Sequence, residues 1–199
     1  MKEIILNKAK LKEDEITEVL NKARIILRND NNEFILSHFE RVYFLPGGKI
    51  EFDETPAQAV IRELKEETNI NILLDDTEPF ALVKNYLRDY KSGDGTIVNR
   101  LVNTYYFTGF TSKDDIEYFN LTIPEKRDDL RAFYIDMEEA KELLKEYNKE
   151  NPKATYLALE TLKILDEYEQ MNIEKYLSIF FFYCIMDLEK GWYYGRRIL

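Results

Sequence analysis

The chain has 199 residues, a formal net charge of −10 at pH 7 and a sequence pI near 4.8. That length suits one domain with a sizeable core and room for an appendage, and the acidic balance argues against broad electrostatic binding of long nucleic acid or of an anionic membrane. The one cysteine, Cys184, cannot form an intrachain disulfide, and the first residues lack the apolar core of a signal sequence, so we expect a cytoplasmic protein.

Two strands are predicted in the first part of the chain. Ala23–Leu27 and Phe34–Phe39 are apolar runs, and the turn-forming segment 28–32, Arg-Asn-Asp-Asn-Asn, joins them. This pattern indicates a hairpin. Residues 10–22 mix charged and aliphatic side chains without a clean period, so a short helix and a strand with a turn both stay open there.

Residues 45–70 contain a glycine-rich loop followed by a helix that carries several carboxylates. Thr55 is a favoured N-cap residue, Pro56 suits the first helical position, and Gln58 stands where a capping box places its acceptor. Asn69 tolerates the left-handed conformation that ends many helices. The helix is therefore expected to begin at Pro56 and to end at Asn69.

Two faces of this helix differ in character. At roughly 100° per residue, an apolar stripe that should pack on a core is formed by Ala57, Val60, Ile61 and Leu64. Glu63, Glu66 and Glu67 gather on another side, where like charges disfavour a helix by roughly 0.2–0.5 kcal/mol per pair. A hard divalent cation such as Mg²⁺ or Mn²⁺ would offset this repulsion, because it takes oxygen ligands. The plainer interpretation is a solvated acidic face.

The loop before the helix favours the metal interpretation. Its Pro-Gly-Gly segment, residues 46–48, allows the backbone to turn sharply and to approach a ligand closely. Glu54 adds a fourth carboxylate at the mouth of the helix. Arg62 can pair with Glu54 or Glu51, which would hold the loop against the helix.

This stretch resembles the signature of the Nudix hydrolases, the MutT-like family. The signature is a Gly, five residues, a Glu, seven residues, and then Arg-Glu-apolar-any-Glu-Glu-any-Gly-apolar. The matching positions are Gly48, Glu54, Arg62, Glu63, Leu64, Glu66, Glu67 and Ile70. Asn69 stands where the family has Gly, which is a mild departure because Asn is the next most tolerant residue in a left-handed cap.

The resemblance implies an α+β fold, the Nudix-type α/β/α sandwich with a mixed sheet. It also implies a hydrolase that uses water and a divalent metal to cleave a nucleoside diphosphate linked to another group. By resemblance, the Gly48 carbonyl, Glu63, Glu66 and Glu67 form the shell of an Mg²⁺ or Mn²⁺ ion, and Glu63 is a candidate to orient or deprotonate the water.

The remaining residues of the motif are expected to position the loop and the substrate. Glu54 and Arg62 would hold the loop and the helix together, and they are counted with the catalytic glutamates. Gly47 and Lys49 are the candidates in the loop for contact with substrate phosphate. The protein's task in such a displacement is mostly positioning and neutralising charge.

Strands are predicted again after the motif, at residues 70–74, 80–90 and 96–110. The segment between the two long strands contains Gly-Asp-Gly, which indicates a hairpin. Arg88 and Arg100 offer donors for substrate phosphate, with cross-strand pairing as the plainer alternative.

The last third of the chain combines an acidic segment with predicted helices. Nudix enzymes often recruit an additional acidic residue from outside the motif, and the candidates within residues 111–129 are Asp114, Asp115, Glu117 and Glu125. A strand at Arg131–Ile135, a helix at Met137–Tyr147 capped by Asp136, and a helix from residue 151 to about Met171 are expected to follow.

We divide the chain into a Nudix hydrolase domain, residues 1–170, and a C-terminal helical and aromatic extension, residues 171–199. An aromatic patch of this kind is either packed on the domain or shared with a second copy in a homodimer. The longest apolar run, residues 177–186, is shorter than the roughly 20 residues that a membrane span needs.

The expected partner is a small-molecule nucleotide, either a nucleoside triphosphate or a sugar nucleotide such as ADP-ribose. Two other functions stay open. A nucleotide-sensing module without turnover is disfavoured by the intact carboxylate set. An isoprenyl-diphosphate isomerase usually needs a reactive cysteine near its site, whereas Cys184 lies in the far tail.

Overall fold

The computed structural model describes residues 1–39, 42–112, 130–150 and 155–195. The chain divides into two compact units, Met1–Leu162 and Lys163–Leu199. The domain boundary at residue 170 stays a prediction. The acidic candidates Asp114, Asp115, Glu117 and Glu125 lie outside the described residues.

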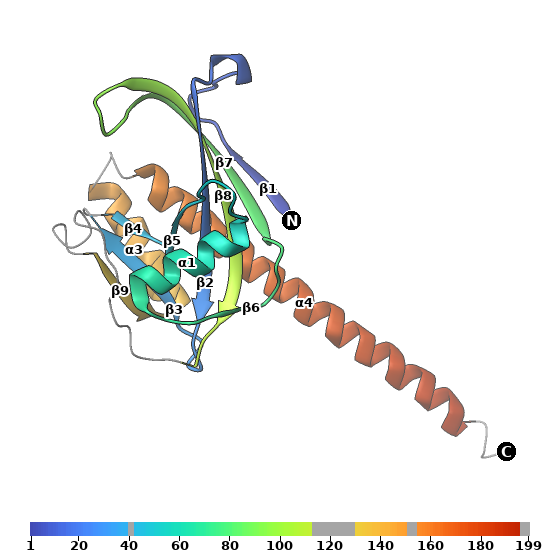
Figure 1. Ribbon diagram of the computed structural model, residues 1–199. Coiled ribbons are helices and arrows are strands. Elements are labelled where there is room, and N and C mark those ends of the chain that lie inside the picture. Colours follow the sequence, from blue (N-terminus) through green and yellow to red (C-terminus); the bar gives the residue numbers. More distant parts are fainter. Residues whose placement is uncertain (40–41, 113–129, 151–154, 196–199) are drawn as a thin grey trace. The chain divides into compact units, whose positions relative to one another are not determined.

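The first unit is built on a mixed sheet (Figure 1). Its described strands are β1 (Lys2–Leu6), β2 (Glu18–Arg28), β3 (Phe34–Phe39), β4 (Val42–Phe44), β5 (Gly47–Lys49), β6 (Leu73–Leu74), β7 (Ala81–Lys91), β8 (Ile97–Phe110) and β9 (Arg131–Ile135). The main order is β1-β7-β8-β2-β3-β4, while β5 pairs with β2, β6 with β8 and β9 with β3. β1 runs parallel to β7 and β2 runs parallel to β8. The other pairs are antiparallel.

Both predicted hairpins are confirmed. β2 and β3 are antiparallel with Arg28 opposite Phe34, and β7 and β8 are antiparallel with Lys91 opposite Ile97. Gly95 closes the second turn at a φ of 90°, and its N–H donates to the Ser92 carbonyl at 2.9 Å. The open segment before the first hairpin contains a short 3₁₀ turn, η1 (Glu13–Glu15), and then the first half of β2.

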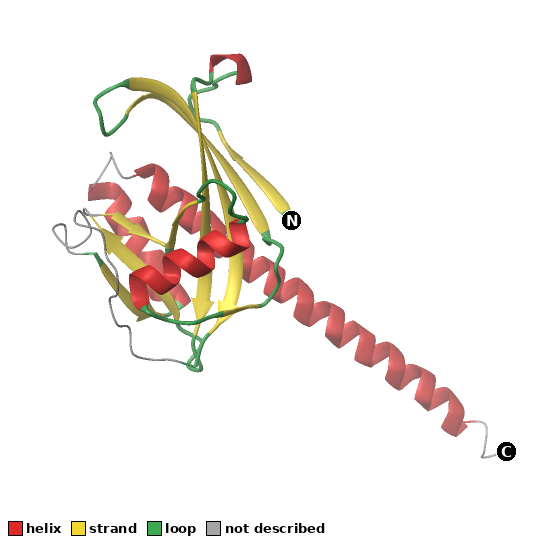
Figure 2. Ribbon diagram, in the orientation of Figure 1, coloured by secondary structure: helices red, strands yellow, loops and turns green. Residues whose placement is uncertain are grey.

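Helices lie on both sides of the strands, which confirms the α+β fold with a mixed sheet (Figure 2). α1 (Pro56–Thr68) covers one face, where Val60 and Leu64 are fully buried with strand residues such as Ala23 and Phe107. Ile61 was expected in this stripe, but it is 41% exposed. Ala59 is buried instead, because the helix is turned so that Val60 and Leu64 lie at the centre of the contact.

The other face of the sheet carries a buried polar cluster. The Tyr106 hydroxyl on β8 donates to Glu160 Oε1 at 2.7 Å, and Asn85 Nδ2 on β7 donates to Glu160 Oε2 at 3.0 Å. Glu160 belongs to the first turns of α4 (Thr155–Gly195) and is only 2% exposed. These bonds fix the beginning of α4 to the sheet.

The helices of the C-terminal part are longer than expected. α3 (Met137–Glu150) is capped by Asp136 as predicted, because Asp136 Oδ1 accepts from the Glu139 N–H at 2.9 Å. α4 continues past the predicted end at Met171, since proline is absent from residues 155–195 and glycine first occurs there at Gly191. Within the described parts of the chain, no helix is long and apolar enough to span a membrane. The homodimer contact stays a prediction.

Candidate active site

The glycine-rich loop is fastened to β2. β5 pairs with β2 so that Gly48 lies opposite Ala23. Gly47 has a φ of 123°, and a Cβ added to it would overlap the Ala23 carbonyl oxygen and lie 2.9 Å from Arg24 Cα. Glycine is therefore required at position 47 by both its conformation and the close approach of β2.

Arg24 holds the residues that precede this loop. Its guanidinium lies 4.7 Å from the centre of the Phe44 ring, and its Nη1 donates to the Leu45 carbonyl oxygen. The Ile25 N–H donates to the Pro46 carbonyl at 3.1 Å. Arg24 is 5% exposed, so β2 contributes a buried cation to the support of the loop.

The local sequence sets both ends of α1 as predicted. Thr55 caps the helix, with its Oγ1 accepting from the Gln58 N–H at 3.2 Å, while Gln58 Oε1 accepts from the Thr55 N–H at 2.9 Å. Asn69 ends the helix in the left-handed conformation at a φ of 54°. The helix therefore starts directly after the loop, and its first turns lie close to β5.

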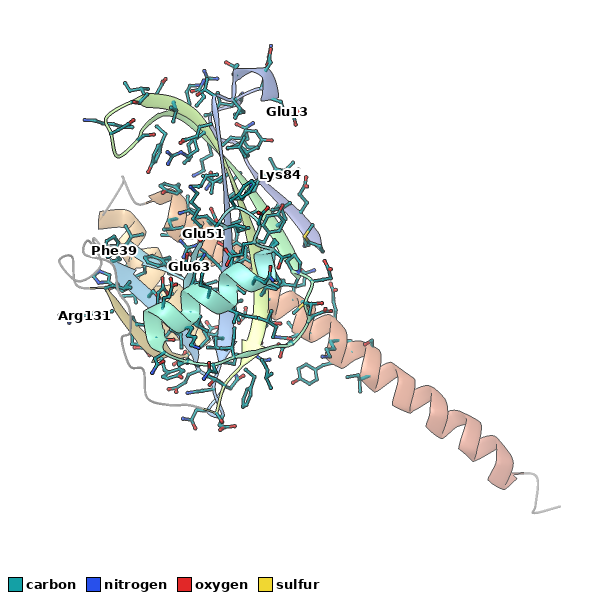
Figure 3. The ribbon with its side chains drawn as sticks, viewed as in Figure 1. Glu13, Phe39, Glu51, Glu63, Lys84 and Arg131 are labelled. Atoms are coloured by element: carbon teal, nitrogen blue, oxygen red, sulfur yellow. The ribbon has the colours of Figure 1, made fainter. Side chains whose placement is uncertain are left out.

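Gly48 and Glu63 are in direct contact. A Cβ added to Gly48 would overlap the carboxylate carbon and both carboxylate oxygens of Glu63. The absence of a side chain at residue 48 thus makes the space that the Glu63 carboxylate fills. Figure 3 labels Glu63 on α1 and Glu51 in the segment that leads into it.

Arg62 links the loop to the helix. Its Nε donates to Glu54 Oε1 at 2.8 Å and its Nη2 to Glu54 Oε2 at 3.0 Å, while Nη2 also donates to the Lys49 carbonyl at 3.1 Å. The expected pairing of Arg62 with Glu54 is confirmed. These hydrogen bonds lower the pKa of Glu54 and raise the pKa of Arg62, because each favours the charged form of its partner.

The same guanidinium lies between two of the three helix glutamates. Arg62 Nη1 donates to Glu63 Oε1 at 3.0 Å and to Glu66 Oε2 at 3.3 Å. Glu66 keeps 45% of its side chain exposed, whereas Glu67 is 7% exposed. Glu67 is buried because, in projection along the helix, it lies within about 20° of Val60.

The donor set has the chemistry of a hard-cation site. Among the described residues, no three acidic, histidine or cysteine side chains already stand where they could hold one metal ion. Glu63 and Glu66 nevertheless converge on one cationic nitrogen, and a carbonyl-bearing glycine lies against the first of them. Carboxylate and carbonyl oxygens are the ligands that Mg²⁺ and Mn²⁺ prefer, so these residues fit such an ion.

Arg88 on β7 pairs with a glutamate of the turn η1, and Arg100 makes a cross-strand ion pair. Arg88 Nη2 lies 3.2 Å from Glu15 Oε1, and Arg100 pairs with Glu18 and lies 4.1 Å from the centre of the Tyr90 ring. On the sheet, Arg100 of β8 lies opposite Glu18 of β2. Glu18 is four residues, or about 13 Å, along β2 from Lys22, which is the β2 residue opposite Lys49 in β5. The role of both arginines in phosphate binding stays a prediction.

Sequence reasoning missed three polar residues near the loop. Arg24 lies in a predicted strand, Glu160 lies in a predicted helix, and Lys22 lies in the segment 10–22, for which a helix and a strand both stayed open. A signal existed for the first two, because Lys22 and Arg24 alternate with Ala23 and Ile25 at the period of a strand. Such alternation places two cations on one face of β2, opposite the apolar residues.

A family model described as NUDIX domain matches residues 20–158, which is more than half of the chain. The chain therefore belongs to the Nudix family. Nudix hydrolases generally use divalent metal ions.

Two curated relatives match short stretches. An 8-oxo-dGTP diphosphatase of Escherichia coli (strain K12) is 49% identical over 51 residues, which cover 23% of this chain and 40% of that protein. An 8-oxo-dGTP diphosphatase of Proteus vulgaris is 44% identical over 55 residues, which cover 25% of this chain and 49% of that protein. The chain thus spans less than half the length of each relative.

Similar solved structures include a MutT protein from Methanosarcina mazei Go1. It is 20% identical with a TM-score of 0.46, over 62% of this chain and 80% of that chain. An Ap4A hydrolase of C. elegans, in a binary complex, is 17% identical with a TM-score of 0.47, over 77% of this chain and 98% of that chain.

Proposed function

We propose that this chain is a metal-dependent pyrophosphohydrolase that cleaves the pyrophosphate linkage of a nucleotide. The observation that carries the proposal is the contact between Gly48 and the Glu63 carboxylate, beside a second carboxylate from Glu66. If these glutamates formed only a solvated acidic face, Glu63 would not need a glycine at position 48 to make room for its carboxylate. Nor would the helix need the hydrogen bonds from Arg62 to the loop.

The Mg²⁺ or Mn²⁺ ion would be held by the carboxylates of Glu63, Glu66 and Glu67 and by the carbonyl of Gly48. When bound, the ion would polarise phosphoryl oxygens and lower the pKa of a bound water. Glu63 would orient the attacking water, and it would exchange its contact with Arg62 Nη1 for the ion. Arg62 would stay fixed through Glu54 and the Lys49 carbonyl, which keeps loop and helix in register.

The substrate that we propose is a small nucleotide. The names of the two curated relatives favour a nucleoside triphosphate, with 8-oxo-dGTP as the first compound to test. A sugar nucleotide such as ADP-ribose is the alternative within the same chemistry. The net charge of −10 disfavours long RNA, and a cytoplasmic location, expected from composition, is part of this proposal.

The test is a turnover assay on 8-oxo-dGTP, dGTP, Ap4A and ADP-ribose, each with Mg²⁺, with Mn²⁺ and with EDTA. We expect hydrolysis of at least one compound, loss of activity in EDTA, and a decrease of orders of magnitude in the Glu67→Gln variant. Glu139→Gln, an exposed glutamate of α3, is the matched control and should keep full activity. Unchanged turnover of Glu67→Gln would remove the metal-site assignment.

A further inference from the structure

Lys22 lies beside Lys49 on the sheet. The two residues are directly opposite each other in the antiparallel pairing of β2 with β5. Directly opposed residues share a face of a sheet, and successive residues alternate between faces. Ala23 belongs to the core under α1, so Lys22 and Lys49 lie on the other face, one residue from Gly48.

The surroundings of Lys22 disfavour its charge. Burial, followed by the neighbouring charge of Arg24, lowers the pKa of Lys22 from 10.5 to about 8. The charges of Glu160 and Glu63 act in the opposite direction, so the ammonium lies within electrostatic range of the motif. At neutral pH, Lys22 therefore still carries a proton, in a place where a cation is costly.

No hydrogen bond or ion pair to another described residue offsets this cost. Other cations near the loop or on the sheet are occupied: Arg24 is bonded to the Leu45 carbonyl, and Lys84 Nζ lies 2.7 Å from Glu3 Oε2. Glu160, the buried acid on the same side, is bonded to Tyr106 and Asn85. Lys22 is thus a partly buried ammonium, and within the described part of the chain its donors have no partner.

An anionic group is the ligand that matches this arrangement. Two lysines on one face present several donors to an oxygen-rich anion. The next residue of β5 is Gly48, and the Glu63 carboxylate of α1 lies against it on the other face of this strand. Under the proposed function, a phosphoryl group of the substrate would come to Gly48, one residue of β5 away from Lys49. The alternative is that Lys22 only covers the sheet with its aliphatic stem, a common role for lysine.

We propose that Lys22 is a phosphate-binding residue of the active site, whose ammonium acts together with that of Lys49 on the pyrophosphate group of the substrate. This inference rests on the proposed function. It adds a residue from outside the motif, and it predicts that pyrophosphate binds to a cationic patch on β2 and β5.

The experiment measures binding of inorganic pyrophosphate, with Mg²⁺ present, by isothermal titration calorimetry. The variants are Lys22→Met, which keeps the stem and removes the charge, and Lys22→Arg, which restores a cation. Lys84→Met is the matched control from another strand of the same sheet. We expect Lys22→Met to weaken binding about tenfold, Lys22→Arg to recover most of it, and Lys84→Met to bind like the wild type.

Pyrophosphate binding separates this inference from the proposed function. If the wild type turns over no nucleotide but binds pyrophosphate in a Lys22-dependent manner, the anion site stands and the proposed reaction fails. If a nucleotide is hydrolysed, Lys22→Met should raise KM more than it lowers kcat. Three results would each overturn the assignment. Lys22→Met could bind pyrophosphate like the wild type, Lys22→Met and Lys22→Arg could weaken binding equally, or the wild type could fail to bind pyrophosphate.

Discussion

Alanine at each of the two loop glycines should have opposite consequences. In Gly47→Ala, the new Cβ meets backbone, the Ala23 carbonyl oxygen and Arg24 Cα, at a φ of 123°. In Gly48→Ala, the three atoms nearest to the new Cβ all belong to the Glu63 carboxylate, and Gly48 is not among the residues with positive φ. The first change strains the fold, and the second displaces one carboxylate.

The magnitudes follow from these contacts. For Gly47→Ala, backbone strain costs about 1–3 kcal/mol and close packing about 1–3 kcal/mol, less about 0.4–1 kcal/mol from the stiffer unfolded chain. The expected loss is about 3 kcal/mol, or roughly 6–12 °C in Tm for a chain of this size. For Gly48→Ala, the same unfolded-state gain opposes the weakening of the Arg62–Glu63 ion pair, whose side chains are 26% and 18% exposed and which is worth about 1 kcal/mol. Its stability should therefore stay within about 1 kcal/mol of the wild type.

The assay is thermal unfolding followed by circular dichroism, together with turnover of the nucleotide found in the substrate screen. We expect Gly48→Ala to keep its Tm and to lose at least tenfold in kcat, because the Glu63 carboxylate can no longer lie against residue 48. Gly47→Ala should lose stability first. If Gly47→Ala melts with the wild type, or if Gly48→Ala is fully active, the described contacts do not govern this loop.

Two further predictions concern the polar side of the sheet. Tyr106→Phe removes a fully buried hydrogen bond to Glu160 and should lower the free energy of unfolding by about 1–3 kcal/mol in urea denaturation. Tyr105→Phe, whose hydroxyl has no hydrogen bond to a described residue, should cost much less, and equal losses would exclude the Glu160 bond as the cause. The second prediction concerns pH: burial and Arg24 lower the pKa of Lys22 in the folded state to about 8, so the unfolded chain binds more protons between about pH 8 and 10.5. As the pH rises through that window, the free energy of unfolding of the wild type should increase relative to that of Lys22→Met. An equal difference between the two proteins in urea denaturation at pH 8 and at pH 10 would contradict this.

Local signals in the sequence predicted the parts of the fold that depend on neighbouring residues. The cap at Thr55, the left-handed Asn69 and the bond between Arg62 and Glu54 need only a helix and a short loop. The prediction of the buried face of α1 was less accurate. Ile61 was expected in it and Ala59 was not, and only the packing of the helix on the sheet decides which of the two is buried.

Features that join distant segments could not be derived in the same way. β1 pairs with β7 across the chain, and Glu160 meets Tyr106 and Asn85 only because α4 returns to the sheet. Lys22 looks like an ordinary strand lysine until its pairing with Lys49 is known. Each of these depends on topology, which periodicity within one segment does not specify.

The parallel pairing of β2 with β8 also bears on how the chain reaches its native state. Glu18 and Arg100 are partners although 82 residues separate them along the chain. Closing so long a loop costs conformational entropy before the strand contacts form and offset that cost. Chains dominated by non-local pairing therefore fold slowly. The strand that supports the glycine-rich loop is therefore expected to pair fully only late in folding, and a nascent chain that ends before β8 would lack the partner of β2.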